Sequence, residues 1–440
     1  MNLWTRFKRD DRGAVLVIAI FVILVFLIGG GAALDYSRHA SAQSGLQEAA
    51  DTAALTAAQE YRRKGWDEAR ALGMSFFEVN QDEANPLVTV DPPSIVLTDS
   101  PSVLVTVTGK TSTTLMRIAG IDEVDFEVVS EVFIPDFPVE ISLVLDTTGS
   151  MGSGGKIQTL RSEASAFVDI VNPDFIDRVS ISVVPFAQHV KVGRGQMGQS
   201  WLNAQDYEEV HIDCVGVVCT ERIERHNWNG CVGSRLSPHN LTDSNYSDGV
   251  PGPVRPGLNC PPNQITALTK DANAVKGAIN ALTPAGWTYI PAGVMWGLRT
   301  LSSQAPYTEA LTPAVRAAEE GLRFMVVMTD GDNTVSYRER NSVVGAGRNR
   351  VEARIGEHSR TGFSLNHANQ TTLAACDAVK AEDIEVFTIA FGTGISSQTR
   401  QMMEDCATDE NNFYNATTNS ALGETFQSIA NKILTIYLSR

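Results

Sequence analysis

Basic residues are scarce in this chain. Its 440 residues include 35 lysines and arginines against 51 aspartates and glutamates, and the formal net charge is −16. A protein that binds nucleic acid needs a basic footprint for the phosphates, so the charge argues strongly against that class. Hydrophobic residues make up 43% and charged residues 20%, close to the globular average, which excludes a disordered, collagenous or polytopic membrane chain. The length predicts two or three domains.

One long apolar run stands near the start, over residues 14–34, without a charged or hydrogen-bonding side chain. As a helix it is about 31 Å long, enough for the hydrocarbon core of a bilayer. A cleaved signal peptide is the alternative, because Ala40-Ser41-Ala42 supplies an A-x-A cleavage site. The apolar part of a signal peptide is shorter, roughly 7–15 residues. We therefore interpret residues 13–34 as a transmembrane helix.

Basic residues cluster before this run. Residues 1–12 contain four basic and two acidic residues, a net charge of 4 − 2 = +2. Because cytoplasmic flanks carry the positive excess, we expect residues 1–12 to be a cytoplasmic tail. The chain after Asp35 then lies outside the cytoplasm.

Cysteine is also rare, with six residues, all on the expected outer side of the membrane. An even number of cysteines in an oxidising compartment predicts disulfides. Zinc is the alternative, since His211 lies near two cysteines, but the sequence contains no CxxC pair. The six are Cys214, Cys219, Cys231, Cys260, Cys376 and Cys406. The first four can pair in three ways. We expect Cys376 and Cys406 to form a disulfide that joins a helix to the loop before the last helix.

Residues 35–138 predict a helix followed by a small α+β module. The helix covers 35–63, a second helix covers 66–78, and a short helical stretch covers 113–119. Val, Ile and Thr enrichment predicts strands over 87–91, 94–98, 102–108 and 124–134. Paired alanines recur every four residues from Ala49 to Ala58. This stripe either lets another helix approach closely or reflects only the high helix propensity of alanine.

From residue 139 the pattern changes to alternating strands and helices. We predict strands at 139–145, 179–185, 322–328 and 385–391, and helices at 156–171, 265–282, 291–301, 371–381 and 422–438. This alternation predicts an α/β fold with a doubly wound, mostly parallel sheet, whose ligand site lies at the carboxyl ends of the strands. Residues 194–263 interrupt it with a Gly-, Pro- and Asn-rich insertion that holds four cysteines.

Oxygen-bearing side chains follow two of these strands. Asp146-Thr147-Thr148-Gly149-Ser150 comes directly after strand 139–145, and Thr329-Asp330-Gly331 comes after strand 322–328. Between them, Thr288 precedes a helix and brings a third hydroxyl. Two carboxylates with neutral hydroxyls suit a hard cation such as Mg²⁺, which keeps several of its waters. A DxTxS segment alone is more often a helix cap, and a TDG segment alone a turn. The three parts together predict a metal site.

The segments DTTGS, GWTYIPAG and VVMTDGDN resemble the three parts of the metal-ion-dependent adhesion site of von Willebrand factor type A domains. The resemblance covers residues 139–438, within an expected domain of 139–440. It implies Mg²⁺ (or Mn²⁺ or Ca²⁺), an open coordination position for a partner's carboxylate, and coupling of ligation to a shift of the last helix. The family usually has Ser where this chain has Thr148. The implied metal ligands are Asp146, Thr148, Ser150, Thr288 and Asp330.

The N-terminal part resembles the TadE/TadG-like pilus-assembly family. The residues that carry this resemblance are Arg12-Gly13, the apolar run, Leu34-Asp35-Tyr36 and the segment LQEAADTAAL at 46–55. The resemblance implies a single-pass protein of a bacterial inner membrane, with a pilin-like region at 35–138 and the bulk of the chain in the periplasm. Its implied partners are other envelope or pilus-assembly proteins, met through the Ala-rich helix 46–58 and the metal site.

A second insertion, 335–366, is rich in arginine. It either offers a positive surface to an acidic partner or forms a solvated loop whose arginines pair with Glu339, Glu352 and Glu357.

The leading hypothesis is a membrane-anchored, metal-dependent binding or adhesion component of a Tad-type pilus assembly system, without catalytic residues. A metal-assisted hydrolase is one alternative, although the sequence has no GxSxG or HExxH motif. A structural minor pilus subunit is the other.

Overall fold

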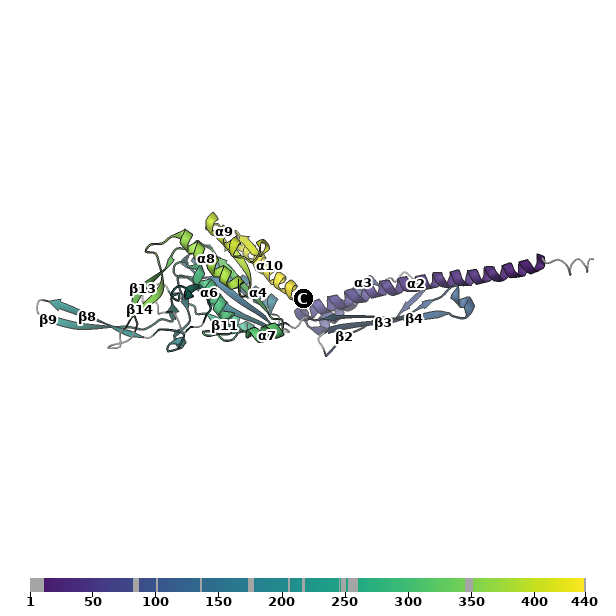
Figure 1. The fold of residues 1–440 in the computed structure, drawn as a ribbon, viewed down its shortest axis with the longest axis horizontal. Coiled ribbons are helices and arrows are strands. Elements are labelled where there is room, and N and C mark those ends of the chain that lie inside the picture. The colour runs from purple at the N-terminus through teal and green to yellow at the C-terminus, as the bar shows by residue number, and fades with distance from the viewer. Residues whose placement is uncertain are drawn as a thin grey trace, which may run out of the picture. The chain divides into compact units, whose positions relative to one another are not determined.

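The computed structural model describes residues 12–81, 87–99, 102–134, 137–172, 178–204, 206–215, 218–244, 246, 251, 260–344 and 351–438. The expected cytoplasmic tail lies outside these residues except for Arg12, where the first helix begins. The chain divides into two compact units, Met1–Asp136 and Phe137–Arg440. Figure 1 labels many of their elements.

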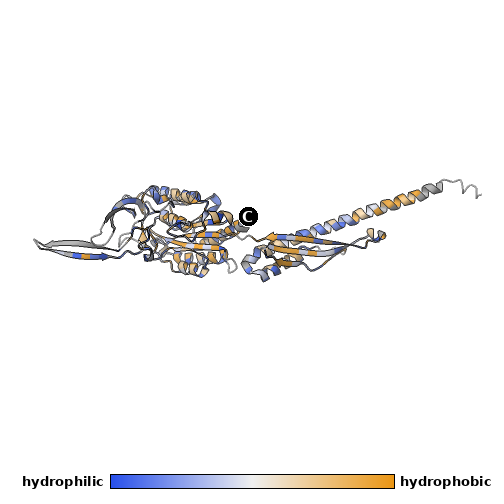
Figure 2. Ribbon diagram, turned by 60° about the horizontal axis from the view of Figure 1, so that its bottom comes forward, coloured by the Kyte–Doolittle hydropathy of each residue, from blue (hydrophilic) through white to orange (hydrophobic). Residues whose placement is uncertain are grey.

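The described part of the first unit starts with one long helix, α2 (Arg12–Lys64), which contains the apolar run and continues without a break beyond it. Gly65 ends this helix with a φ of +78°, a conformation that favours glycine, and α3 (Trp66–Asn80) follows at once. The apolar end of α2 is coloured orange in Figure 2, and its side chains are largely exposed, as at Phe21 and Phe26. By length and composition this helix can cross a membrane.

A four-stranded antiparallel sheet packs on α2. The central strand β3 (Ser102–Ser112) pairs along one edge with β1 (Val88–Val90) and β2 (Ser94–Leu97), and along the other with β4 (Glu123–Phe133). Val103, Val105 and Val107 are buried, as the two-residue period of a strand requires. A short 3₁₀ turn, η1 (Met116–Ala119), lies between β3 and β4. These strands confirm the predicted α+β module, although β3 extends four residues beyond the predicted end.

The alanine stripe of α2 faces inward. Ala49, Ala53 and Ala57 are fully buried in a core shared with β3 and β4. The chain's own α3 makes the close approach: a Cβ added at Gly73 would lie 3.0 Å from the Ala53 carbonyl oxygen and 3.0 Å from the Ala57 Cβ. The prediction that segment 46–58 meets another protein is therefore wrong for these alanines, because the unit itself covers them.

The second unit is built on an eight-stranded sheet of order β10-β7-β6-β5-β12-β15-β16, with β11 also paired to β6. Its centre is parallel: β6 (Val179–Phe186), β5 (Val139–Asp146), β12 (Leu322–Thr329), β15 (Glu385–Phe391) and β16 (Phe413–Ala416). The short strands β7 (Val190–Lys191), β10 (Cys231–Val232) and β11 (Thr266–Thr269) are antiparallel. The predicted doubly wound, mostly parallel fold is confirmed.

Helices cover both faces of this sheet and build two cores. On one face α4 (Lys156–Val171), α5 (Ala272–Asn280) and α10 (Asn419–Leu438) pack over Ile141 and Leu143 of β5. On the other, α6 (Ile290–Thr300), α8 (Leu365–Lys380) and α9 (Ser397–Cys406) pack over Val144. A short helix, α7 (Pro313–Ala318), precedes β12. Because both faces of the central strands are covered, every residue of β12 is buried, and its middle, residues 324–328, is apolar throughout.

The predicted helix at 265–282 is wrong in its first third. Residues 266–269 form β11, which pairs with the edge of β6, and the helix begins only after Asp271. The Asp271 side chain accepts hydrogen bonds from the backbone N–H groups of Asn273 and Ala274, a cap that starts a new helix. The prediction also missed α9 and β16.

The cysteine-rich insertion contains structure that the sequence did not predict. A hairpin, β8 (Tyr207–Val215) with β9 (Val218–His226), extends from it. Cys231 and Cys260 form a disulfide with a Cα–Cα distance of 5.8 Å. Cys214 and Cys219 are directly paired in the hairpin register, but their side chains and that of His211 lie outside the description. The zinc alternative at these three residues is therefore untested.

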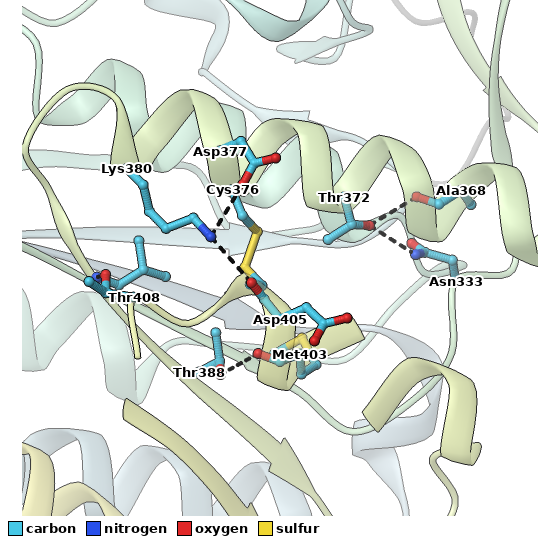
Figure 3. Close-up of a disulfide and its surroundings, with 12 residues drawn as sticks. Asn333, Ala368, Thr372, Cys376, Asp377, Lys380, Thr388, Met403, Asp405 and Thr408 are labelled. Carbon is cyan, nitrogen blue, oxygen red and sulfur yellow. Dashed lines mark hydrogen bonds and ion pairs between the residues drawn. A yellow bond between two sulfur atoms is a disulfide. The ribbon is translucent and has the colours of Figure 1, made fainter. Parts of the chain in front are cut away.

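The predicted bridge between Cys376 and Cys406 is present, with a Cα–Cα distance of 5.3 Å. Figure 3 shows it joining α8 to the segment that carries Met403 and Asp405. Cys406 closes helix α9 and is fully buried, so the bridge joins two helices, where the sequence predicted a helix and a loop.

The arginine-rich insertion forms a hairpin, β13 (Ser336–Val344) with β14 (Val351–Ser359). Arg338 donates to Glu357 at 2.9 Å, and Arg354 pairs with Glu339. These two pairs support the interpretation that the arginines pair with acidic residues of the same insertion. The paired residues lie on strands, whereas the sequence predicted a loop. Arg348 and Arg350 lie outside the described residues.

Candidate metal centre

Two parallel strands bring the two aspartates to one edge of the sheet. In the register of β5 and β12, Leu145 lies opposite Met328, so Asp146 and Asp330 follow one and two residues later. Both strands are fully buried along their length, and the chain turns away only at their carboxyl ends. Asp146 and Asp330 are themselves 0% and 2% exposed. The predicted proximity of the two carboxylates follows from this topology.

Asp146 is held by its own neighbourhood. Its Oδ1 accepts from the backbone N–H of Thr148 at 2.8 Å, and its Oδ2 accepts from the hydroxyl of Thr329 at 2.6 Å. Burial, and after it the negative charge of Asp330, raise the pKa of Asp146 to about 7, while these hydrogen bonds oppose the rise. An ionised carboxylate here lacks a compensating charge, which is what a bound cation supplies.

A chain of hydroxyls connects the first loop to the second carboxylate. Thr148 Oγ1 and Ser150 Oγ lie 2.9 Å apart, and Ser150 Oγ donates to Asp330 Oδ1 at 2.6 Å. Ser150 belongs to the 3₁₀ turn η2 (Gly149–Gly152), which bends the chain back after β5. Four of the five predicted ligands are therefore linked by hydrogen bonds within one small cluster.

Thr288, the fifth predicted ligand, lies between the two loops. Gly149 N–H donates to the Gly286 carbonyl at 3.0 Å, which joins the Thr288 segment to the first loop. Thr288 N–H donates to the hydroxyl of Thr334 at 2.8 Å, which joins it to the loop after Asp330. Its side chain is 4% exposed. The segment thus packs against both loops that carry the carboxylates.

Lys156 belongs to the cluster and was not predicted. Its Nζ donates to Asp330 Oδ2 at 2.8 Å, while its side chain is 21% exposed. It is the first residue of α4, where the helix dipole disfavours a cation. That unfavourable position is the only sequence signal that could have singled it out.

The loop after Asp330 is fixed by two further residues that the sequence analysis did not single out. Asp332 Oδ1 accepts from the backbone N–H and the hydroxyl of Ser396, at 3.0 and 2.9 Å. Asn333, 1% exposed, accepts from the backbone N–H of Ile290 at 2.8 Å and donates to Asn369 on α8 at 3.0 Å. These contacts hold Asp330 in position through its neighbours.

The donor set fits a hard cation. Two carboxylates and three hydroxyls supply only oxygen, the element that Mg²⁺, Mn²⁺ and Ca²⁺ prefer. Among the described side chains no group of three or more His, Cys, Asp and Glu residues is placed to hold a metal. A softer site built on histidine and cysteine therefore finds no support in the described part of the chain.

Comparison with protein families gives one match. Residues 13–60 match the Flp pilus-assembly TadE/G-like family. The match covers the apolar run and the whole alanine stripe of α2, so the resemblance predicted from these residues is confirmed. No curated protein matches the chain significantly.

Several solved structures are similar at low identity. The pilus adhesin SpaC from Lactobacillus rhamnosus GG shares 15% identity over 81% of this chain, with a TM-score of 0.40, and this chain spans 35% of its length. The vWF domain of the type V pili tip protein Mfa5 from Porphyromonas gingivalis shares 15% identity over 69% of this chain and 97% of its own, with a TM-score of 0.41. Proximal thread matrix protein 1 from the mussel byssus, with a zinc-occupied MIDAS motif, shares 14% identity over 68% of this chain and 48% of its own length, with a TM-score of 0.36.

Proposed function

We propose that this protein is a membrane-anchored, metal-dependent binding component of a Tad-type pilus assembly system. The match of residues 13–60 to a pilus-assembly family supports the system. The linked cluster of Asp146, Thr148, Ser150 and Asp330 at the carboxyl edge of the sheet supports the metal site, and it is the observation that carries the proposal.

In the proposed site, Asp146, Thr148, Ser150, Thr288 and Asp330 hold Mg²⁺, Mn²⁺ or Ca²⁺. The five residues would leave one position of an octahedral ion open, so that an acidic group of a partner could complete its coordination. The protein residues fix the geometry: Thr329 orients Asp146, and Asp332 and Asn333 hold the loop of Asp330. Because these contacts exist before a partner arrives, little ordering is needed on binding.

A binding role fits this site better than catalysis. Among the described residues, the five proposed ligands exchange no hydrogen bond with a histidine or cysteine that could serve as general base or nucleophile. We therefore propose a non-enzymatic protein. The hydrolase alternative requires turnover of a substrate in the presence of metal, and the structural-subunit alternative requires the chain to occur in sheared filaments.

The proposed location is a bacterial inner membrane, crossed once by residues 13–34, with the N-terminus cytoplasmic and the second unit in the periplasm. The exposed apolar end of α2 and the family match support the anchor. The two disulfides support an oxidising compartment for the second unit.

Isothermal titration with Mg²⁺ and Mn²⁺ tests the metal site, using the full chain in detergent micelles. Asp146→Ala and Asp330→Ala should abolish binding, because each removes a charged ligand. Thr148→Ala, Ser150→Ala and Thr288→Ala remove neutral ligands and should weaken binding less. Asp169→Ala is the matched control, since Asp169 is an exposed aspartate of the same unit that pairs with Lys276. Equal binding in Asp146→Ala and wild type would refute the site.

Crosslinking in the envelope, followed by identification of the captured chains, tests the partner. Wild type should capture a partner that Asp146→Ala and Asp330→Ala do not, while all three chains reach the same level in the membrane. Capture that is equal in wild type and both variants would show that the partner binds elsewhere.

A further inference from the structure

Two isoleucines are exposed on the loop between β3 and β4, residues 113–122, which we call the β3–β4 loop. Ile118 is 73% exposed and Ile121 is 43% exposed. A single exposed apolar side chain is ordinary on a protein surface. The position of this pair on the molecule makes it informative, because the loop lies beside the apolar end of α2.

The loop is bound tightly to α2 through one carboxylate. Asp35 Oδ2 accepts hydrogen bonds from three consecutive backbone N–H groups of the loop: Thr114 at 3.0 Å, Leu115 at 2.6 Å and Met116 at 2.8 Å. Asp35 is 5% exposed. Because three donors converge on one ionised oxygen, the loop and this turn of α2 form one fixed structure.

The loop also contacts α2 inside the apolar run. A Cβ added at Gly31 would lie 2.5 Å from the Leu115 Cβ, so Leu115 packs directly on the glycine backbone. The apolar run ends three residues later, at Leu34. Leu34 and Tyr36 are 57% and 71% exposed on the same stretch of helix. The β3–β4 loop therefore lies at the level where the apolar helix gives way to polar residues.

We infer that the β3–β4 loop dips into the outer surface of the membrane, with Ile118 and Ile121 among the lipid headgroups and upper acyl chains. The inference rests on the proposed membrane anchor, because a helix that spans the bilayer over residues 13–34 places Asp35 at the interface. Tyr36 on α2 would lie at the same depth, where aromatic rings are favoured.

Two arginines lie on or beside the loop. The Arg38 side chain is 54% exposed and donates to Thr114 Oγ1 at 3.3 Å. The Arg117 side chain is 71% exposed and pairs with Asp122. Arginines at the headgroup level meet phosphate oxygens. The membrane would thus hold the first unit at two points, the helix and the loop, which restricts its tilt and rotation.

Photocrosslinking to lipid tests the inference on the full chain, reconstituted in vesicles of phosphatidylethanolamine and phosphatidylglycerol. Benzoylphenylalanine replaces Ile118 in one variant, Phe26 in a second and Phe133 in a third. Phe26 lies in the apolar run and is 76% exposed, so it reports on the anchor itself. Phe133 is 67% exposed at the other end of β4, about 33 Å along the strand from Glu123.

We expect lipid adducts at positions 26 and 118, with yields at 118 about tenfold or more above those at 133, because a side chain in water does not meet acyl chains. If position 26 forms lipid adducts but the yield at position 118 is no higher than at position 133, the inference is overturned and the anchor stands. A lack of adducts at 26 would overturn the anchor. Crosslinks from 118 to a protein in place of lipid would also overturn the inference.

A pair of glycine variants tests the role of the loop contact in the same assay. Gly31→Leu should displace Leu115, because the new Cβ would lie 2.5 Å from the Leu115 Cβ. The adduct yield at position 118 should then fall. Gly30→Leu is the matched control, because a Cβ at Gly30 meets no heavy atom within 4 Å. Equal yields in the two variants would contradict the seating of the loop on α2.

Discussion

Lys156 donates a hydrogen bond to the second oxygen of Asp330 at 2.8 Å, while Ser150 occupies the first. The protein therefore places a cation of its own against one of the two carboxylates proposed to hold a metal. A lysine ammonium is a compact point charge on a flexible stem, so it can withdraw when a divalent ion competes for the carboxylate. We therefore expect Lys156 to set how strongly the proposed site attracts that ion.

Replacing this lysine should strengthen metal binding. A hydrogen bond to a charged group contributes about 1.5–3 kcal/mol, so Lys156→Met should raise the affinity for Mg²⁺ by about tenfold or more in a calorimetric titration. Lys276→Met is the matched control, because Lys276 pairs at 2.7 Å with an aspartate remote from the cluster. An unchanged or lower affinity in Lys156→Met would mean that the lysine does not compete with the ion.

Metal should also stabilise the second unit against heat. A ligand at a hundredfold its dissociation constant adds about 2.7 kcal/mol to the free energy of unfolding, so saturating Mg²⁺ should raise the Tm by several degrees. Chelation should reverse the rise, and Asp330→Asn should abolish it. Tryptophan fluorescence follows this unit, which contains four of the six tryptophans. A Tm insensitive to Mg²⁺ in wild type would contradict binding to the folded state.

The bridge between α8 and α9 should contribute substantially to stability. Cys376 and Cys406 are 30 residues apart, for which the chain-entropy model gives about 4 kcal/mol. Cys376→Ala/Cys406→Ala should therefore unfold at a clearly lower denaturant concentration than wild type. In Cys376→Ala alone, Cys406 should become open to alkylation in the denatured, unreduced chain. An unreactive Cys406 in that variant would indicate a different pairing.

Acid should destabilise the second unit through a buried histidine. Burial lowers the pKa of His358 well below its usual value, and the neighbouring His189 lowers it further. The His358 ring stacks on His189 and packs in a tilted arrangement against Tyr289, and its Nε2 lies 2.8 Å from the hydroxyl of Ser234. In the unfolded chain the same imidazole titrates near pH 6.5 and there binds more protons than the folded one. Stability should therefore fall as the pH drops below about 6.5, by up to about 1.4 kcal/mol per pH unit from this group.

Thermal unfolding between pH 7.5 and pH 5 measures this effect. His358→Gln should show a lower Tm at pH 7.5, because it loses the stacked ring, and a flatter dependence on pH. His239→Gln is the control, since His239 lies on the short turn η4 (His239–Leu241) and its Nδ1 lies 3.3 Å from the hydroxyl of Ser244. A pH dependence as steep in His358→Gln as in wild type would exclude His358 as its source.

The proposed orientation predicts the behaviour of C-terminal fusions. A reporter that is active only outside the cytoplasm should be active when fused after Arg440, and the fusion should stay in the membrane fraction. Deletion of residues 13–34 should abolish both properties, since the basic flank and apolar run direct the insertion. A soluble mature form that begins near residue 43 would show that Ala40-Ser41-Ala42 is cleaved and that the helix is a signal sequence.

Much of the second unit could be predicted from local pattern. Strand β15 and helix α4 have the predicted bounds. A buried parallel strand is mostly apolar, and a helix that covers a sheet shows apolar residues with a 3.6-residue period. The same logic predicts that Asp146 and Asp330 share an edge, because parallel strands end together. Prediction from local pattern fails at 265–282, because Asp271 caps a new helix there and so divides the segment into a strand and a helix.

The sequence by itself determined the type of the main strands and helices of the second unit and which strand ends carry oxygen-bearing side chains, because side-chain periodicity reports local structure. Only the tertiary structure decided which groups meet. In the folded chain α3 packs on the alanine stripe, Cys231 bonds to Cys260, and Lys156 donates to Asp330. Periodicity carries no information about partners distant in the chain. Those are selected by the packing of whole elements, and Lys156 reaches Asp330 only because α4 starts beside the loop that follows β12.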